Sequence, residues 1–358
     1  MAKFSEVLTI INGRNQKQVV CDDGKYPIYG SGGIMGYAND YICKAETVVI
    51  GRKGSINKPI FVETPFWNVD TAFGLCANSE KLNPKYLYYF CEKFDFEKLN
   101  TTVTIPSLTK SNLLNIEIPL PNLEKQKQIV ELLDKVTSLI SFRKQQLAKL
   151  DELVKARFVE MFGDPIRNEK GWNTYTLAEM CDGIGDGLHG TPEYDENGEY
   201  PFINGNNLIS GIIQINPSTK KVNKKTYEKH YIKISQNAIL LSINGTLGRI
   251  AFYNSEQVML GKSACYCNLR DEVNRIFVYN IMKTDAFARY LEDNATKSTI
   301  KNVGLKAIRE YRLIMPPIPL QNQFSSFVER VDRQKQTVQQ SLEKLELMKK
   351  ALMQEYFG

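Results

Sequence analysis

The stretch from Pro119 to Gly163 reads PLPNLEKQKQIVELLDKVTSLISFRKQQLAKLDELVKARFVEMFG and carries a heptad pattern. Its apolar residues recur at alternating steps of three and four, the spacing of a coiled-coil seam. The apolar seam positions are Ile129, Leu133, Val136, Ile140, Leu147, Leu150, Val154 and Met161. Arg143 and Arg157 fill the other two positions, where long side chains can reach a polar partner at the edge of the seam. We predict one long helix that needs a partner with a matching stripe.

The end of the chain, from Pro316 to Gly358, offers that partner: PPIPLQNQFSSFVERVDRQKQTVQQSLEKLELMKKALMQEYFG. Its apolar seam positions are Phe324, Val328, Val331, Val338, Leu342, Leu345, Leu352 and Tyr356, with Lys335 and Lys349 as the gaps. Each stretch is entered through prolines and closes on Phe-Gly, so the chain is a tandem repeat. At 1.5 Å per residue each helix would be about 60 Å long.

We predict that the two helices pair within one chain, antiparallel, as a coiled coil. The alternative is two surface helices, each packed on its own domain. A seam sustained over several heptads is narrower than the stripe of an ordinary globular helix, which favours pairing.

Composition places the chain among globular proteins of more than one domain. It has 358 residues, of which 42% are hydrophobic and 24% charged, and this length suits two or three domains. Its seven cysteines are odd in number and scattered, which is typical of reduced thiols in a cytoplasm. The first residues lack the apolar run of a signal peptide, and no later run is long enough to span a bilayer. We therefore expect a cytoplasmic protein, neither secreted nor membrane-spanning, and its net charge of +6 permits a nucleic-acid partner.

The segments outside the two helices also repeat, in the same order. Tyr26-Pro27-Ile28-Tyr29 corresponds to Tyr200-Pro201-Phe202-Ile203, and the β-type run 47–55 corresponds to 238–246. Helices are predicted at 83–99, with Asn83 as N-cap and Pro84 in the first position, and at 275–291. The fold class is therefore α+β, with two β-rich domains alternating with two long helices. The expected boundaries are 1–121 for the first domain, 122–163 for the central helix, 164–319 for the second domain and 320–358 for the C-terminal helix.

The sequence carries no recognisable catalytic motif. Neither His189 nor His230 has metal-ligand or Ser/His/Asp spacing around it, so each is expected at the surface or as a DNA contact. Residues 185–190 spell GxGxxG, but Thr191-Pro192 follows where a dinucleotide site needs a helix. A phosphate-binding P-loop and a methyltransferase box are both missing. We expect a protein that is not an enzyme, with no catalytic residue and no metal site.

Polar and basic loops recur at matching places in both domains. Lys, Ser and Thr suit phosphate oxygens, whereas Arg, Asn and Gln can read base edges. The residues that we predict to bind DNA are Arg14, Lys17, Ser31, Arg52, Lys53, Ser55, Thr104, Ser107, Lys110, Lys220, Lys221, Lys224, Lys225, Asn244, Thr246, Arg249, Lys297, Thr299 and Lys301. Arg52 and Arg249 are expected to contact separate half-sites. Each run taken alone is also what a solvated surface looks like, and the two domains can differ by drift alone.

This order of segments resembles the specificity (S) subunit of type I restriction-modification systems. The likeness covers the whole chain. Its best-matching segments are Ile118-Pro119-Leu120-Pro121 running into 124–134, the helix residues Leu147, Leu150 and Leu153, Gly51-Arg52-Lys53-Gly54-Ser55, and 83–90. One departure is that Gln321-Asn322-Gln323 stands where the first helix has Glu124-Lys125-Gln126, so the second helix is expected to meet a partner differently.

The resemblance implies a target-recognition subunit that reads a bipartite site on double-stranded DNA. Each recognition domain would read one half-site, and the antiparallel helices would set the spacer. It also implies two methyltransferase subunits as partners, which bind S-adenosylmethionine, and restriction subunits that add ATP- and Mg-dependent cleavage. This chain itself would bind no cofactor.

Two other functions remain open from the sequence. A non-enzymatic interaction scaffold would use the helices for assembly and the β-rich domains to bind protein. A stand-alone methyltransferase or nuclease would need a cofactor or metal motif that the sequence does not show. Selection of a bipartite DNA sequence would separate the recognition subunit from both.

Overall fold

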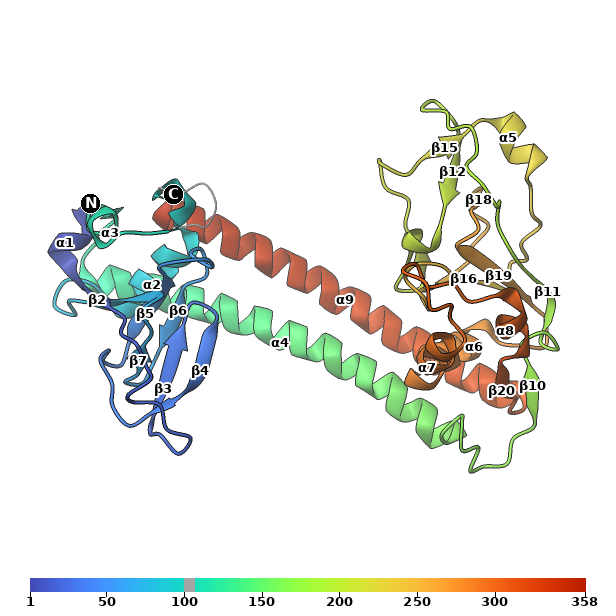
Figure 1. Ribbon diagram of the computed structural model, residues 1–358, viewed down its shortest axis with the longest axis horizontal. Helices are drawn as coiled ribbons and strands as arrows, with labels where there is room; N and C mark the ends of the chain where they lie inside the picture. Colours follow the sequence, from blue (N-terminus) through green and yellow to red (C-terminus); the bar gives the residue numbers. More distant parts are fainter. Residues whose placement is uncertain (100–106) are drawn as a thin grey trace. The chain divides into compact units, whose positions relative to one another are not determined.

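The computed structural model describes residues 1–99 and 107–358 (Figure 1). It divides into two compact units, each containing parts of both long helices. Unit 1 comprises Met1–Leu147 and Thr337–Gly358, and unit 2 comprises Ala148–Gln336. Each is described by itself below.

Unit 1 combines short strands with a few short helices and parts of the two long ones. Its strands are β1 (Ala2–Lys3), β2 (Leu8–Asn12), β3 (Tyr26–Gly30), β4 (Gly33–Ala38), β5 (Thr47–Gly51), β6 (Ile60–Val62), β7 (Trp67–Asn68), β8 (Ala72–Ala77) and β9 (Glu117–Ile118). Its short helices are α1 (Phe4–Val7), α2 (Pro84–Lys93), the 3-10 helix η1 (Phe96–Leu99) and α3 (Lys110–Leu114). The long helices are α4 (Leu123–Phe162) and α9 (Ile318–Phe357).

Unit 2 is built in the same way. Its strands are β10 (Thr174–Thr176), β11 (Cys181–Asp186), β12 (Tyr200–Ile203), β13 (Leu208–Ile209), β14 (Ile212–Ile213), β15 (Lys221–Val222), β16 (Ala238–Ser242), β17 (Ile250–Phe252), β18 (Met259–Leu260), β19 (Ala264–Leu269) and β20 (Arg312–Ile314). Its helices are η2 (Gly205–Asn207), α5 (Lys224–Lys229), α6 (Arg275–Met282), α7 (Asp285–Asp293) and α8 (Leu305–Glu310).

The sheet topology of unit 1 is repeated in unit 2. The four-stranded sheets have the orders β2-β8-β5-β6 and β11-β19-β16-β17, and the three-stranded sheets have the orders β4-β3-β7 and β15-β12-β18. A two-stranded ladder closes each unit, β1-β9 in the first and β10-β20 in the second. The predicted duplication of an α+β domain is therefore confirmed.

Helices α4 and α9 pack against each other, antiparallel, along the predicted seam. Both are 40 residues long. In unit 1 Leu133 is fully buried, and Arg143 Nε donates to Ser341 Oγ at 3.2 Å. In unit 2 Phe324 is fully buried, and Lys335 pairs with Asp151 at 2.6 Å. Every position of both predicted seams is buried or half-buried, which confirms the coiled-coil prediction.

The charged seam positions have polar or aromatic partners, as predicted for the edge of a seam. Arg157 pairs with Glu160 at 2.8 Å, and Lys349 pairs with Glu92 at 2.9 Å and lies over the ring of Tyr89. The ion pair of Arg157 with Glu160 lies within α4, whereas the contacts of Lys349 join α9 to α2 in unit 1.

Both predicted shorter helices are interrupted. The helix expected at 83–99 begins on the Asn83 cap, as predicted, but α2 ends at Lys93 because Phe94 turns extended. Phe96 is then fully buried, with its ring packed against Phe94. The helix expected at 275–291 is divided at Thr284, whose side chain accepts from Phe287 N and so starts α7.

A buried glutamine joins each long helix to the N-cap of the preceding short helix. Gln126 is fully buried; its Oε1 accepts from Asn83 N at 2.8 Å, and its Nε2 donates to Pro121 O at 2.8 Å. Gln321, 1% exposed, makes the equivalent bonds to Asn274 N and Pro316 O at 3.1 and 2.7 Å.

These bonds correct the alignment of the two helix starts. Gln321 is the counterpart of Gln126, so the triplet 321–323 does not stand in the place of 124–126. The triplet in the place of Glu124-Lys125-Gln126 is instead Pro319-Leu320-Gln321. The expectation that the second helix meets a partner differently stays a prediction.

Candidate functional site

One edge of the four-stranded sheet in unit 1 gathers most of its predicted binding residues. Strands β2 and β5 both run antiparallel to β8, so their C-terminal ends meet the start of β8 at a single edge. Arg14 N donates to Asn68 O at 2.8 Å, and Arg52 N donates to Thr71 O at 2.8 Å. The loop 68–71 therefore holds the backbone of both arginines through its carbonyl groups.

Three separate loops converge at this edge. Lys53 forms an isolated β-bridge with Ser107. A β-carbon on Gly51 would lie 2.4 Å from Ser55 O and 3.0 Å from Ser31 Cβ, so the turn after β3 packs directly on the end of β5. The predicted residues brought together here are Arg14, Ser31, Arg52, Lys53, Ser55 and Ser107.

The remaining predictions in unit 1 have other settings. Lys17 lies in a turn in which its N–H donates to Asn15 Oδ1 at 2.9 Å. Lys110 is the first residue of α3, which Thr109 caps. Thr104 lies outside the described residues.

The corresponding edge of unit 2 holds a polar pocket of about 560 Å³. Strands β11 and β16 end there, and β19 begins there. The lining residues are Asp186, His189, Ile243, Asn244, Lys262, Thr296, Ser298, Asn302, Val303, Gly304 and Leu305. The pocket is therefore built from the ends of three strands and the segment that leads into α8.

Hydrogen bonds fix the side chains of this pocket. Asn244 Nδ2 donates to Asn302 Oδ1 at 3.1 Å. His189 Nε2 lies 2.7 Å from Asp186 Oδ2, and the histidine side chain is 70% exposed while the aspartate is 18% exposed. The carboxylate thus orients an imidazole ring that faces solvent.

Of the predicted residues in unit 2, Asn244 lines the pocket, and others stand on the segments around it. Thr246 and Arg249 belong to the turn between β16 and β17, where Arg249 Nη1 donates to Asn206 O at 3.2 Å. Lys301 forms an ion pair with Glu292. Lys297 and Thr299 are exposed on the segment that carries Asn302.

The four predicted lysines between 220 and 225 stand on a different element, at β15 and the start of α5. Lys220 lies 4.5 Å from the ring centre of Tyr194, and Lys224 pairs with Glu228 at 3.8 Å. Lys221 and Lys225 are exposed beside them. None of the four lines the pocket.

The two edges share one backbone, which matching hydrogen bonds establish. Leu108 N donates to Arg52 O, and Val303 N donates to Ile243 O. The next turn has a glycine at positive φ in each unit, Gly54 at +78° and Gly245 at +75°. Arg52 and Ile243 are therefore equivalent positions that carry different side chains.

Sequence reasoning missed one loop of this shared edge. Val69 N donates to Tyr29 O, and Gly261 N donates to Ile203 O. The next residues, Asp70 and Lys262, are therefore equivalent, exposed and of opposite charge. The matching strand pairs would have revealed this loop, because β7 precedes β8 as β18 precedes β19.

The groups that could serve catalysis are sparse. Among residues 1–99 and 107–358, no three His, Cys, Asp or Glu side chains are placed to hold a metal ion. Burial raises the pKa of the Cys43 thiol to about 12 and also raises the pKa of Cys91, so both thiols stay protonated at neutral pH. The GxGxxG run at 185–190 does not open a helix, as a dinucleotide site would need. Strand β11 ends at Asp186, and Gly187 packs against the backbone of Leu260.

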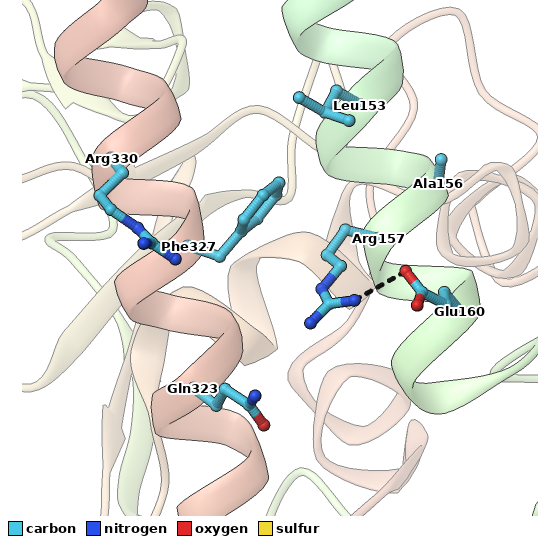
Figure 2. A pocket seen from close by; sticks show the side chains of 7 residues that line it. All are labelled: Leu153, Ala156, Arg157, Glu160, Gln323, Phe327 and Arg330. Atoms are coloured by element: carbon cyan, nitrogen blue, oxygen red, sulfur yellow. Dashed lines mark hydrogen bonds and ion pairs between the residues drawn. The ribbon is translucent and has the colours of Figure 1, made fainter.

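A second cavity, of about 610 Å³, lies between α4 and α9 in unit 2 (Figure 2). It is lined by Leu153, Ala156, Arg157, Glu160, Gln323, Phe327 and Arg330. Leu153 is 46% exposed, and the guanidinium of Arg157 lies 5.9 Å from the ring centre of Phe327. We call it the helix groove of unit 2.

Because Gln126 and Gln321 are equivalent, each residue of this groove has a counterpart in unit 1. The counterparts are, in the same order, Met348, Ala351, Leu352, Glu355, Gln128, Leu132 and Lys135. Met348 is 50% exposed and Leu132 is 38% exposed. Six of the seven positions keep their chemical character, the exception being Arg157 and Leu352. The helix faces are thus maintained where the sheet edges have diverged.

A known protein family matches both halves of this duplicated chain. The sequence matches the type I restriction modification DNA specificity domain over residues 1–152 and again over 169–347. The chain belongs to this family. It is a non-catalytic subunit that recognises specific DNA sequences.

Curated relatives agree. A putative type I restriction enzyme specificity subunit of Haemophilus influenzae is 24% identical, over 92% of this chain and 86% of that protein. The MjaIX specificity subunit of Methanocaldococcus jannaschii is also 24% identical, over 78% of this chain and 68% of that protein.

Solved structures share the fold. The S subunit of a type I restriction-modification system from M. genitalium aligns with a TM-score of 0.65 at 17% identity, over 100% of this chain and 95% of that one. A chain from a structure of type I complex assembly and conformational transition aligns with a TM-score of 0.59 at 15% identity, over 99% and 96%. In the described part of this chain, no helix is long and apolar enough to cross a membrane.

Proposed function

We propose that this subunit reads a bipartite site on double-stranded DNA, with one half-site at the sheet edge of each unit. The observation that carries this proposal is that the two sheet edges have the same backbone arrangement but carry different side chains. Arg52 and Lys53 in unit 1 stand where unit 2 has Ile243 and Asn244. Unlike side chains on one scaffold present different donors and acceptors, so the two half-sites should differ.

The sheet edges suit base contacts, and the neighbouring lysines suit phosphate contacts. Exposed Arg52 and half-buried Asn244 can make the paired hydrogen bonds that distinguish bases in the major groove. Lys220, Lys221, Lys224 and Lys225 would contact phosphates and position unit 2 without reading sequence. Lys301 would first have to leave Glu292, and Lys224 would have to leave Glu228, so these two are the weakest of the predicted contacts.

Residues 1–121 and 164–319 are the proposed recognition domains, with the segments 122–163 and 320–358 as the spacer. Paired helices are stiffer than single ones, so they would hold the two domains at a set separation. The number of base pairs between the half-sites would then depend on helix length.

The partners that we propose are two methyltransferase subunits, one on the helix groove of unit 2 and one on the equivalent helix face of unit 1. The residues of the helix groove of unit 2 recur on the equivalent helix faces of unit 1 while the sheet edges differ, which suits two copies of the same protein. Leu153 and Met348 give these faces exposed apolar anchors, and Glu160 and Glu355 give them a charged rim. The partners would supply S-adenosylmethionine for methylation, and restriction subunits would add ATP and Mg. The complex would act in the cytoplasm.

Selection from random duplex DNA tests the proposal. The full chain, assembled with its methyltransferase subunit, would be incubated with randomised duplexes, and the bound fraction sequenced. We expect two unlike half-sites separated by a constant spacer. A scaffold would select no sequence, and a palindromic site would contradict the assignment of one half-site to each unit.

A further inference from the structure

The loop between β7 and β8 and its counterpart between β18 and β19 place opposite charges at one position of a common scaffold. In unit 1 the loop is Val69-Asp70-Thr71, and in unit 2 it is Gly261-Lys262-Ser263. Each loop closes with the same hydrogen bond, from Ala72 N to Val69 O in unit 1 and from Ala264 N to Gly261 O in unit 2, at 3.0 and 2.9 Å. The middle residue is exposed in both.

Both middle residues lie beside the groups that the proposed function uses. In unit 1 the carbonyl of the next residue, Thr71, accepts from Arg52 N. In unit 2 the carbonyl of its counterpart, Ser263, accepts from Ile243 N at 3.1 Å. Lys262 also lines the pocket that contains Asn244 and His189. The middle residue of each loop is therefore at the sheet edge itself.

An aspartate at a DNA-facing sheet edge is suited to bases and not to phosphates. Its carboxylate repels phosphates, and the donors that bases present to it in the major groove are exocyclic amino groups, above all cytosine N4. A lysine offers the opposite set, since its ammonium only donates and the guanine O6 and N7 atoms accept. Aspartate and lysine at this position would therefore bind different groups on the bases, a donor amino group in one case and acceptor atoms in the other.

We propose that Asp70 and Lys262 are specificity-determining residues, with Asp70 accepting from a cytosine amino group in one half-site and Lys262 donating to a guanine in the other. His189 lines the same pocket as Lys262. Its Nε2 atom contacts Asp186, so its Nδ1 atom is left to contact the neighbouring base. This inference rests on the proposed function, because it needs the sheet edges to face bases.

The test uses Asp70→Asn and Lys262→Met in the full chain, assembled with its methyltransferase subunit and selected against random duplexes. Glu63→Gln and Lys233→Met are the matched controls, because they remove one charge from the opposite sheet edge of units 1 and 2. We expect Lys262→Met to relax one guanine of the unit 2 half-site by about 5- to 150-fold. The unit 1 half-site should stay as it was, and Asp70→Asn should relax one cytosine there with the unit 2 half-site unchanged.

The other bases of the altered unit's own half-site report in each experiment that this unit is folded, and the half-site of the unaltered unit reports that the complex is assembled. If both variants keep every wild-type base preference and bind more weakly or more tightly on all sequences alike, the two side chains face phosphates and this inference is overturned. If relaxation occurs at bases other than a cytosine and a guanine, the assigned chemistry is wrong. Failure of the unaltered chain to select a bipartite sequence would instead overturn the proposed function.

Discussion

Two buried glutamines show how a single side chain can fix the start of a long helix. Gln126 satisfies the backbone N–H of Asn83 and the carbonyls of Lys81 and Pro121 at once. An amide is the one side-chain group with both a donor and an acceptor in this geometry. In unit 2 the equivalent Gln321 accepts from Asn274 N and donates to Pro316 O and to Met315 Sδ.

Replacing Gln126 with Leu should therefore destabilise unit 1 by about 1–3 kcal/mol, because buried backbone groups lose their partners. Hydrogen exchange would locate the loss, with faster exchange in α2 and at the start of α4. Gln128→Leu is the matched control, since Gln128 is exposed on the same helix. Equal effects of both variants would show that helix propensity, not the buried amide, accounts for the change.

At the residue scale, sequence alone located the basic loops but not their partners. The runs at 52–55 and 107–110 are far apart in sequence, and they are joined by the β-bridge between Lys53 and Ser107 and by the hydrogen bond from Leu108 N to Arg52 O. Asp70 and Lys262 carried no signal of their own, because an isolated charge in a short loop is typical of any surface. Their equivalence becomes visible only through the matching of two strands that are each two residues long.

The long helices were the most predictable elements, because a heptad seam is repeated many times and needs no knowledge of the rest of the chain. Their bounds were expected at 122–163 and 320–358 and are observed at Leu123–Phe162 and Ile318–Phe357. The shorter helices were harder, since α2 and α7 depend on single residues, Phe94 and Thr284, whose role is set by tertiary packing.

The helix groove of unit 2 and its equivalent face in unit 1 lead to a prediction at the scale of these elements. Leu153 and Met348 are equivalent, exposed and not part of the buried seam, so replacing either with Asp should leave the fold intact. Each single variant should lose one methyltransferase subunit, because the charge prevents burial of that helix face. The double variant should lose both.

Native mass spectrometry of the assembled complex would count the partners directly. Leu347→Asp is the control, because Leu347 is 67% exposed on the same helix and does not belong to the groove. A single variant that releases both partners, or a double variant that releases none, would show that docking occurs elsewhere.

At the scale of the whole molecule, the pseudo-symmetry of α4 and α9 gives a way to change the spacer without changing the reading edges. Segments 142–148 and 337–343 are equivalent, and each spans one heptad. Removing both would keep each seam in phase, so that Ile140 is followed in register by Leu150, and Lys335 by Leu345. The helix groove of unit 2 and its equivalent face in unit 1 lie outside the removed segments.

The double deletion shortens each helix by about 10 Å at 1.5 Å per residue, which corresponds to about 3 base pairs at 3.4 Å per base pair. We expect selection from random duplexes to return both half-sites unchanged with a spacer shorter by up to that number. Deleting only one segment is the control, because it leaves the two helices unequal and puts contacts such as Lys335 to Asp151 out of register. An unchanged spacer in the double deletion, with both half-sites still selected, would mean that something other than the paired helices sets the distance between the reading edges.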